Sequence, residues 1–152
     1  MTTYTELLAE SDCNRLIAKE KPLRANRGRI KGNRIAIKQD LSETEKICIL
    51  AEELGHYYTT SGNILDQNIT TNRKQERTAR LWAYNRLIGL TGLIDCYRSG
   101  CRSRFEMAEH LGVTEEFLNE AVECYKQKYS PCTVVDNYLV TFEPLGVLEL
   151  YK

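Results

Sequence analysis

Residues 42–58 read SETEKICILAEELGHYY and carry a clear helix signal together with a candidate site. Ser42 followed by Glu45 forms a capping-box pattern, in which a hydroxyl and a carboxylate satisfy the free N–H groups of a helix start. Apolar side chains then recur at helical spacing, at Ile47, Leu50, Ala51 and Leu54. The stretch therefore predicts an amphipathic helix that runs to about Tyr58.

The same helix carries Glu52-Glu53-Leu54-Gly55-His56, which differs by one residue from the H-E-x-x-H pattern of zinc hydrolases. Four residues turn a helix by about 400°, so Glu52 and His56 share a face and can bind one metal. Glu53 lies about 100° further round, where it suits a base for a water that the metal activates. A carboxylate oxygen is an accepted zinc ligand, so Glu52 is chemically compatible with the first ligand position.

A catalytic zinc site also needs a third protein ligand and an open position. Glu76 is the best-placed candidate, because the loop before its helix allows that helix to fold back over the first. An ordinary acidic helix explains the same pattern without a metal. Glu52 and Glu53 are then solvated charges, and His56 is a C-terminal residue favoured by the helix dipole. Spacing alone leaves both interpretations open.

Weaker patterns predict the rest of the chain. The expected elements are a helix over 4–18, a hairpin over 29–38 around Gly32-Asn33, a polar loop over 59–72, helices over 74–90, 105–111 and 115–129, and strands over 133–142 and 145–150. Gly89, Gly92 and Gly100 are expected to interrupt the chain between the helices. This order predicts one α+β domain over 1–152, with a helix-turn-helix-like helical hairpin over 104–129.

Composition narrows the function classes. The chain has 152 residues, with 21 basic and 21 acidic side chains, so its total charge does not point to nucleic acid or to a membrane surface. No apolar run is long enough for a membrane span, and the N-terminus does not read as a secretory signal. We therefore expect a cytoplasmic protein without a membrane partner. Its six cysteines form no C-x-x-C pair, and we expect them to be reduced, small apolar residues.

Residues 104–122 also match parts of a DNA-reading helix-turn-helix, with Ala108, Gly112 and Leu118 at the small, turn and apolar positions. The second helix of this unit is acidic, which is the wrong sign for phosphate contacts. Its acidic residues are Glu115, Glu116, Glu120 and Glu123. A plain helical hairpin is the preferred interpretation, and no direct nucleic-acid binding is expected.

Taken in order, several segments resemble the ImmA/IrrE-type metallopeptidases of bacteria, phages and mobile elements. They are NRIAIK (33–38), LSETEK (41–46), ILAEELGHY (49–57), ERTARLWA (76–83), MAEHLGVT (107–114) and YLVTFEPLG (138–146). The resemblance implies a zincin-like minimal metallopeptidase domain. Such a domain has a small β-sheet, an active-site helix, and a C-terminal helical hairpin plus a β-hairpin.

The resemblance also implies roles for individual residues. Glu53 is the catalytic base, and His56 and Glu76 are metal ligands. Glu52 stands where the family has its first histidine, which makes the metal set Glu52, His56 and Glu76. Zn²⁺ is the expected cofactor, and Mn²⁺ is the alternative because two carboxylates and one imidazole form a harder donor set.

The implied function is metal-dependent cleavage of a regulatory protein. Members of this family typically cleave a helix-turn-helix repressor encoded beside them, so the expected partner is such a repressor from a prophage or related element. The alternative is a non-catalytic interaction protein that keeps the peptidase fold. The Glu52 position is what keeps this alternative open, because it changes the ligand set on which activity depends.

Overall fold

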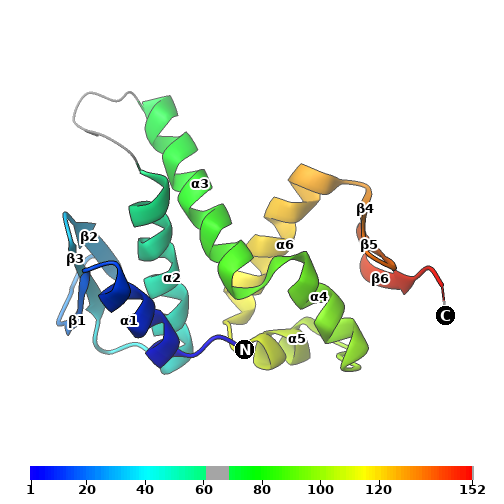
Figure 1. The fold of residues 1–152 in the computed structure, drawn as a ribbon, viewed down its shortest axis with the longest axis horizontal. Helices are drawn as coiled ribbons and strands as arrows, with labels where there is room; N and C mark the ends of the chain where they lie inside the picture. Colours follow the sequence, from blue (N-terminus) through cyan, green and yellow to red (C-terminus); the bar gives the residue numbers. More distant parts are fainter. Residues whose placement is uncertain (61–68, 152) are drawn as a thin grey trace. The chain divides into compact units, whose positions relative to one another are not determined.

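The computed structural model describes residues 1–60 and 69–151, and the side chains of all of these except 69–72. The elements are α1 (Tyr4–Cys13), β1 (Ile17–Lys21), β2 (Gly28–Lys31), β3 (Arg34–Lys38), α2 (Glu43–Thr59), α3 (Ile69–Leu87), α4 (Gly89–Arg98), α5 (Arg104–Leu111), α6 (Glu115–Tyr129), β4 (Cys132–Val135), β5 (Tyr138–Phe142) and β6 (Leu145–Glu149). The mixture of helices and small sheets confirms the α+β class (Figure 1). Among the described residues, no helix combines the length and the hydropathy that a membrane span requires.

The chain divides into two compact units, Thr2–Ala83 and Tyr84–Lys152 together with Met1. In the first unit the strands form a sheet in the order β1-β3-β2, with β1 parallel and β2 antiparallel to β3. Helices α1 and α2 pack against each other, and α2 also contacts β2 and β3 (Figure 1). Leu7, Ile35, Ile37, Leu50 and Leu54 are the largest apolar side chains fully buried in this unit.

The predicted helix over 4–18 is confirmed as far as residue 13 and is wrong over 14–18. Helix α1 ends at Cys13, and Arg15 adopts a left-handed backbone conformation with φ of 59°. Asn14 closes the helix, since its side-chain amide donates to the Glu10 carbonyl at 2.9 Å. Ile17 and Ala18 then pair in parallel with Arg34 and Ile35, so a long-range strand pairing replaces the expected helical turn.

The hairpin prediction is confirmed by β2 and β3, with Gly32 at a φ of 61° in the turn between them. The loop predicted over 59–72 falls largely on residues outside the described part. Residues 69–72 belong to α3, so the loop prediction is wrong at its end, and α3 begins earlier than the predicted residue 74.

The second unit confirms the helical hairpin over 104–129. Gly112, with a φ of 71°, ends α5, and the Thr114 hydroxyl caps α6 by accepting from the Phe117 N–H at 3.0 Å. The predicted interruption at Gly92 is wrong, because Gly92 lies inside α4. Buried Leu93, Ile94 and Cys96 provide the apolar stripe that stabilises this helix.

The single strand predicted over 133–142 is also wrong. Asp136, at a φ of 52°, and Asn137 form a turn between β4 and β5. The C-terminal β-hairpin is therefore a three-stranded antiparallel sheet in the order β4-β5-β6. The Asn137 side chain fixes the chain end by accepting from the Tyr151 N–H at 2.9 Å.

Candidate functional site

Helix α2 provides most of the candidate site. The Ser42 hydroxyl starts the helix by accepting from the Glu45 N–H at 3.2 Å, and it also lies 3.1 Å from the Glu45 carboxylate. Most of the buried side of the helix is apolar, as its periodicity predicts. Glu53 is the exception, because it is only 9% exposed and is the one acidic side chain buried among the described residues.

Glu53 lies against the sheet at β2. A methyl group added at Gly28 would stand 3.2 Å from Glu53 Oε1 and 2.3 Å from the Ile49 Cγ2 methyl. The strand can therefore approach α2 this closely only with glycine at position 28. Helical spacing places Glu53 beside the face that Glu52 and His56 share. Its burial under β2, however, depends on the contact between Gly28 and α2.

Helix α3 approaches α2 at a second glycine. A methyl group at Gly55 would lie 2.2 Å from the Ala79 carbonyl oxygen, a distance that no packed side chain tolerates. Gly55 is one of the two unspecified residues of the E-E-x-x-H pattern. Its lack of a side chain lets the backbones of α2 and α3 come into contact, one turn away from Glu76.

This approach brings His56 and Glu76 together. His56 Nε2 lies 3.0 Å from Glu76 Oε2, and the two side chains are 26% and 45% exposed. The other carboxylate oxygen of Glu76 accepts from Arg80 Nε at 3.1 Å. The expected folding back of α3 is thus observed, and the structure brings two of the three predicted ligands into direct contact.

The electrostatics of the cluster centre on Glu53. Burial, together with the nearby carboxylates of Glu52 and Glu76, raises the pKa of Glu53 to about 7. A carboxylate with a pKa near neutrality can both accept and return a proton under physiological conditions. Glu52 is partly exposed and interacts electrostatically with Glu53.

The donor groups fit a divalent cation in type and in charge. Two ligands about 2.1 Å from a tetrahedral ion lie roughly 3.4 Å apart, which is close to the 3.0 Å between His56 and Glu76. A cation would also offset the carboxylate repulsion that acts on Glu53. Within residues 1–60 and 73–151, however, no three His, Cys, Asp or Glu side chains are grouped closely enough to hold a metal. The complete set of Glu52, His56 and Glu76 therefore stays a prediction.

His110 and Tyr58, two further polar side chains on the helices, have structural roles. His110 Nε2 lies 2.8 Å from Asp95 Oδ2, and this contact provides the second histidine of the chain with a polar partner. The Tyr58 ring packs against Trp82 in a tilted arrangement with centroids 4.8 Å apart, and its hydroxyl donates to Glu10 at 3.3 Å. We assign Tyr58 to packing between α1, α2 and α3.

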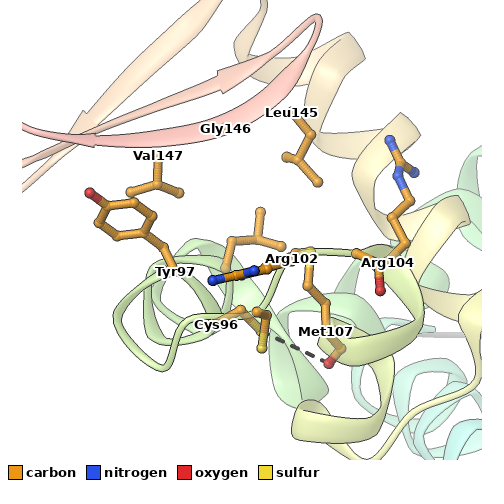
Figure 2. Close-up of a pocket in the computed structure, with 11 residues that line it drawn as sticks. Cys96, Tyr97, Arg102, Arg104, Met107, Leu145, Gly146 and Val147 are labelled. Carbon is orange, nitrogen blue, oxygen red and sulfur yellow. Dashed lines mark hydrogen bonds between the residues drawn. The ribbon is translucent and has the colours of Figure 1, made fainter.

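A cavity of about 210 Å³ lies in the second unit, between the α4–α5 region and β6. Figure 2 shows Cys96 in its wall, with its thiol 3.9 Å from the Met107 carbonyl oxygen. Burial is the main cause that raises the pKa of Cys96 to about 12, so its nucleophilic thiolate form is scarce at neutral pH. The six cysteines are all free thiols, and this buried one does not provide a nucleophile.

Comparison with known protein families identifies the family of this chain. The peptidase M78 family model, described as an IrrE N-terminal-like domain, matches residues 14–123. The chain belongs to the peptidase M78 family. No curated protein and no solved structure matches it.

The M78 match spans α2 and α3 and so includes Glu52, Glu53, His56 and Glu76. The chain thus carries a peptidase-type domain, and the resemblance drawn from its motifs is confirmed. Sequence reasoning missed Gly28, Gly55 and Arg80. Gly55 had an available signal, because a glycine destabilises a helix interior by about 1 kcal/mol relative to alanine, and close packing against a neighbour would explain that cost.

Proposed function

We propose that this M78 family member is a metal-dependent endopeptidase that acts on a regulatory protein. The observation that carries the proposal is the contact between His56 and Glu76 beside the buried carboxylate of Glu53. A histidine and two carboxylates from neighbouring helices, with a base poised near neutral pKa, suit hydrolysis of a peptide bond.

His56 and Glu76 would hold the metal, with Glu52 as the third ligand. When bound, a divalent ion supplies Lewis acidity toward water and the peptide carbonyl. Glu53 would accept the proton of the attacking water on its carboxylate and deliver it to the leaving amine. Its place under β2 shields this carboxylate from bulk water, and its raised pKa matches both steps.

Zn²⁺ is the proposed metal and Mn²⁺ the alternative. Two carboxylates and one imidazole form a harder ligand set than two imidazoles and one carboxylate, and hard oxygen donors favour Mn²⁺. The proposed substrate is a helix-turn-helix repressor of a prophage or related element, met in the cytoplasm. Membership of the M78 family supports a peptidase-type activity, and the repressor as substrate is what the resemblance of the motifs implies.

The test combines metal analysis with cleavage. Protein purified without chelator should contain close to one equivalent of metal, bound at about 2.0–2.2 Å from each ligating atom. Glu53→Gln should keep the metal and lose cleavage of a co-encoded repressor, since an amide cannot accept the proton at neutral pH. His56→Ala should lose the metal itself. Normal cleavage by Glu53→Gln would eliminate Glu53 as the base.

A non-catalytic interaction protein is the second candidate function. It is favoured by the replacement of the family's first histidine by Glu52 and by the lack of a preformed three-ligand group in the described part of the chain. Protein that contains no metal and also fails to bind added Zn²⁺ or Mn²⁺ would support this candidate over the endopeptidase.

A further inference from the structure

The outer face of the β1-β3-β2 sheet is strongly basic. Side chains alternate between the two sides of a strand, so the register of the sheet fixes which residues share this face. They are Ile17, Lys19 and Lys21 on β1, Arg29 and Lys31 on β2, and Arg34, Ala36 and Lys38 on β3. We call these eight residues the basic face. Six are cationic and none is acidic.

The opposite side of the same sheet has a different composition. Ile35 and Ile37 are buried there against the helices. Glu20, the one acidic residue of these three strands, also points to that side, and it pairs with Lys46 of α2 at 2.6 Å. The period-two pattern therefore separates the charges cleanly, with the acid on the helix side and the cations on the outer side.

The basic face encloses a shallow cavity of about 430 Å³. Ile17, which is 43% exposed, and Ala36 form part of an apolar floor between the strands. The walls are Lys19, Lys21, Arg29, Lys31 and Arg34, all exposed. No ion pair joins any of these five cations to another residue in the described part of the chain.

Neighbouring cations on one sheet face repel each other. Lys31 and Arg34 are direct cross-strand partners, a placement that destabilises a sheet when the charges are alike. An anionic partner would offset this repulsion, and an aliphatic side chain of that partner would cover the exposed floor at Ile17.

We propose that the basic face binds an acidic segment of a partner protein, with carboxylates on the cationic walls and an apolar side chain on the floor. This inference concerns binding alone and holds whether or not the bound chain is cleaved. Three strands about 4.8 Å apart, two of five residues and one of four, give a face of roughly 10 by 15 Å. That area suits a helix of about ten residues at 1.5 Å per residue.

The face fits a protein segment better than a nucleic acid. Binding of single strands relies on aromatic side chains that stack with bases, and none of the eight residues is aromatic. Duplex binding relies on a strong positive field, whereas the whole chain has zero formal net charge. The apolar floor also lacks a counterpart in a phosphate backbone.

The test uses the full chain carrying Glu53→Gln, so that binding is measured without cleavage. The probe is a fluorescein-labelled peptide of about twelve glutamate and leucine residues with leucines at helical spacing. Two comparison peptides have glutamine in place of glutamate, or glutamate in place of leucine. Anisotropy should show that the mixed peptide binds most tightly and that added salt weakens it.

The variant is Lys19→Glu with Lys31→Glu, one reversal on each outer strand. Two such reversals should weaken binding of the mixed peptide by about tenfold or more. The matched control is Arg98→Glu with Lys128→Glu, which makes the same charge change at exposed residues outside the face and should bind as the parent does. Thermal unfolding should show that the Lys19 and Lys31 variant stays folded, because it relieves repulsion.

Each other outcome overturns the proposal. Equal loss in both double variants would mean that only total charge matters. Tighter binding of a twelve-nucleotide DNA strand than of the mixed peptide would assign the face to nucleic acid. A dimer that dissociates only in the Lys19 and Lys31 variant would assign it to a second copy of the chain. No binding of the mixed peptide below millimolar concentration would leave the face without the proposed partner.

Discussion

Replacing Glu53 by glutamine should stabilise the metal-free protein, and the gain should depend on pH. The folded protein raises the pKa of Glu53 from 4.5 to about 7. The folded protein therefore favours the protonated form of Glu53. The contribution of this protonated side chain to the free energy of unfolding is fully present below pH 4.5 and is lost as the pH rises to 7. The difference between a pKa of 4.5 and one of about 7 corresponds to roughly 3 kcal/mol of lost stability above pH 7. Glutamine has nearly the same shape and no charge, so Glu53→Gln escapes this loss.

The measurement is urea-induced unfolding in the presence of a chelator at two pH values. The variant should exceed the parent in unfolding free energy by about 3 kcal/mol at pH 8 and by only about 1 kcal/mol at pH 5. Glu109→Gln is the matched control, because Glu109 is an exposed glutamate of α5 and its replacement should change stability little at either pH.

The pH dependence is what tests the reasoning. A gain of the same size at both pH values would show that the glutamine packs better, without any contribution from ionisation. No gain in unfolding free energy at pH 8 would mean that Glu53 is not buried beside other carboxylates as the structure shows. Bound metal should reduce the gain at pH 8, since a cation compensates the same carboxylate charges.

Other expectations concern the packing, the ligand set and nucleic acid. Gly55→Ala should cost about 1–3 kcal/mol in urea unfolding and weaken metal binding, because its methyl group meets the Ala79 carbonyl at 2.2 Å. Gly92→Ala, whose methyl group would find its nearest neighbour at 3.3 Å, should be close to neutral in the same assay. Glu52→His should tighten Zn²⁺ and reduce the preference for Mn²⁺ in titrations, and unchanged affinity for both metals would remove residue 52 from the site. The protein alone should not bind operator DNA sequence-specifically below micromolar concentration in a salt-dependent gel-shift assay.

Local signals account for the elements that the sequence predicts correctly. The Ser42 cap and the apolar period define α2, the Gly32-Asn33 turn defines the β2–β3 hairpin, and the Gly112 break separates α5 from α6. Each of these depends on residues close together in the chain. The prediction of the contact between His56 and Glu76 has a different basis. Spacing along the chain suggests the contact, and the family resemblance gives Glu76 its role as a metal ligand.

The errors share a physical cause, which is pairing between distant parts of the chain. Ile17 and Ala18 continue a helical pattern, yet they pair with β3, which only the folded sheet provides. The burial of Glu53 likewise depends on Gly28, which lies in another element. Periodicity alone places Glu53 beside the ligand face and gives no measure of how strongly its proton is held.

Strand β2 links the candidate site and the basic face while keeping them chemically separate. Gly28 and Ile30 point toward α2, where Gly28 leaves room for Glu53. Arg29 and Lys31 alternate to the other side, so they line the cavity of the basic face and do not contact the carboxylate cluster. Variants of the outward residues should therefore change partner binding without changing metal content, and variants of the inward residues should do the reverse. A protein in which both properties always change together would contradict the separation of the two sides of β2 that the strand register gives.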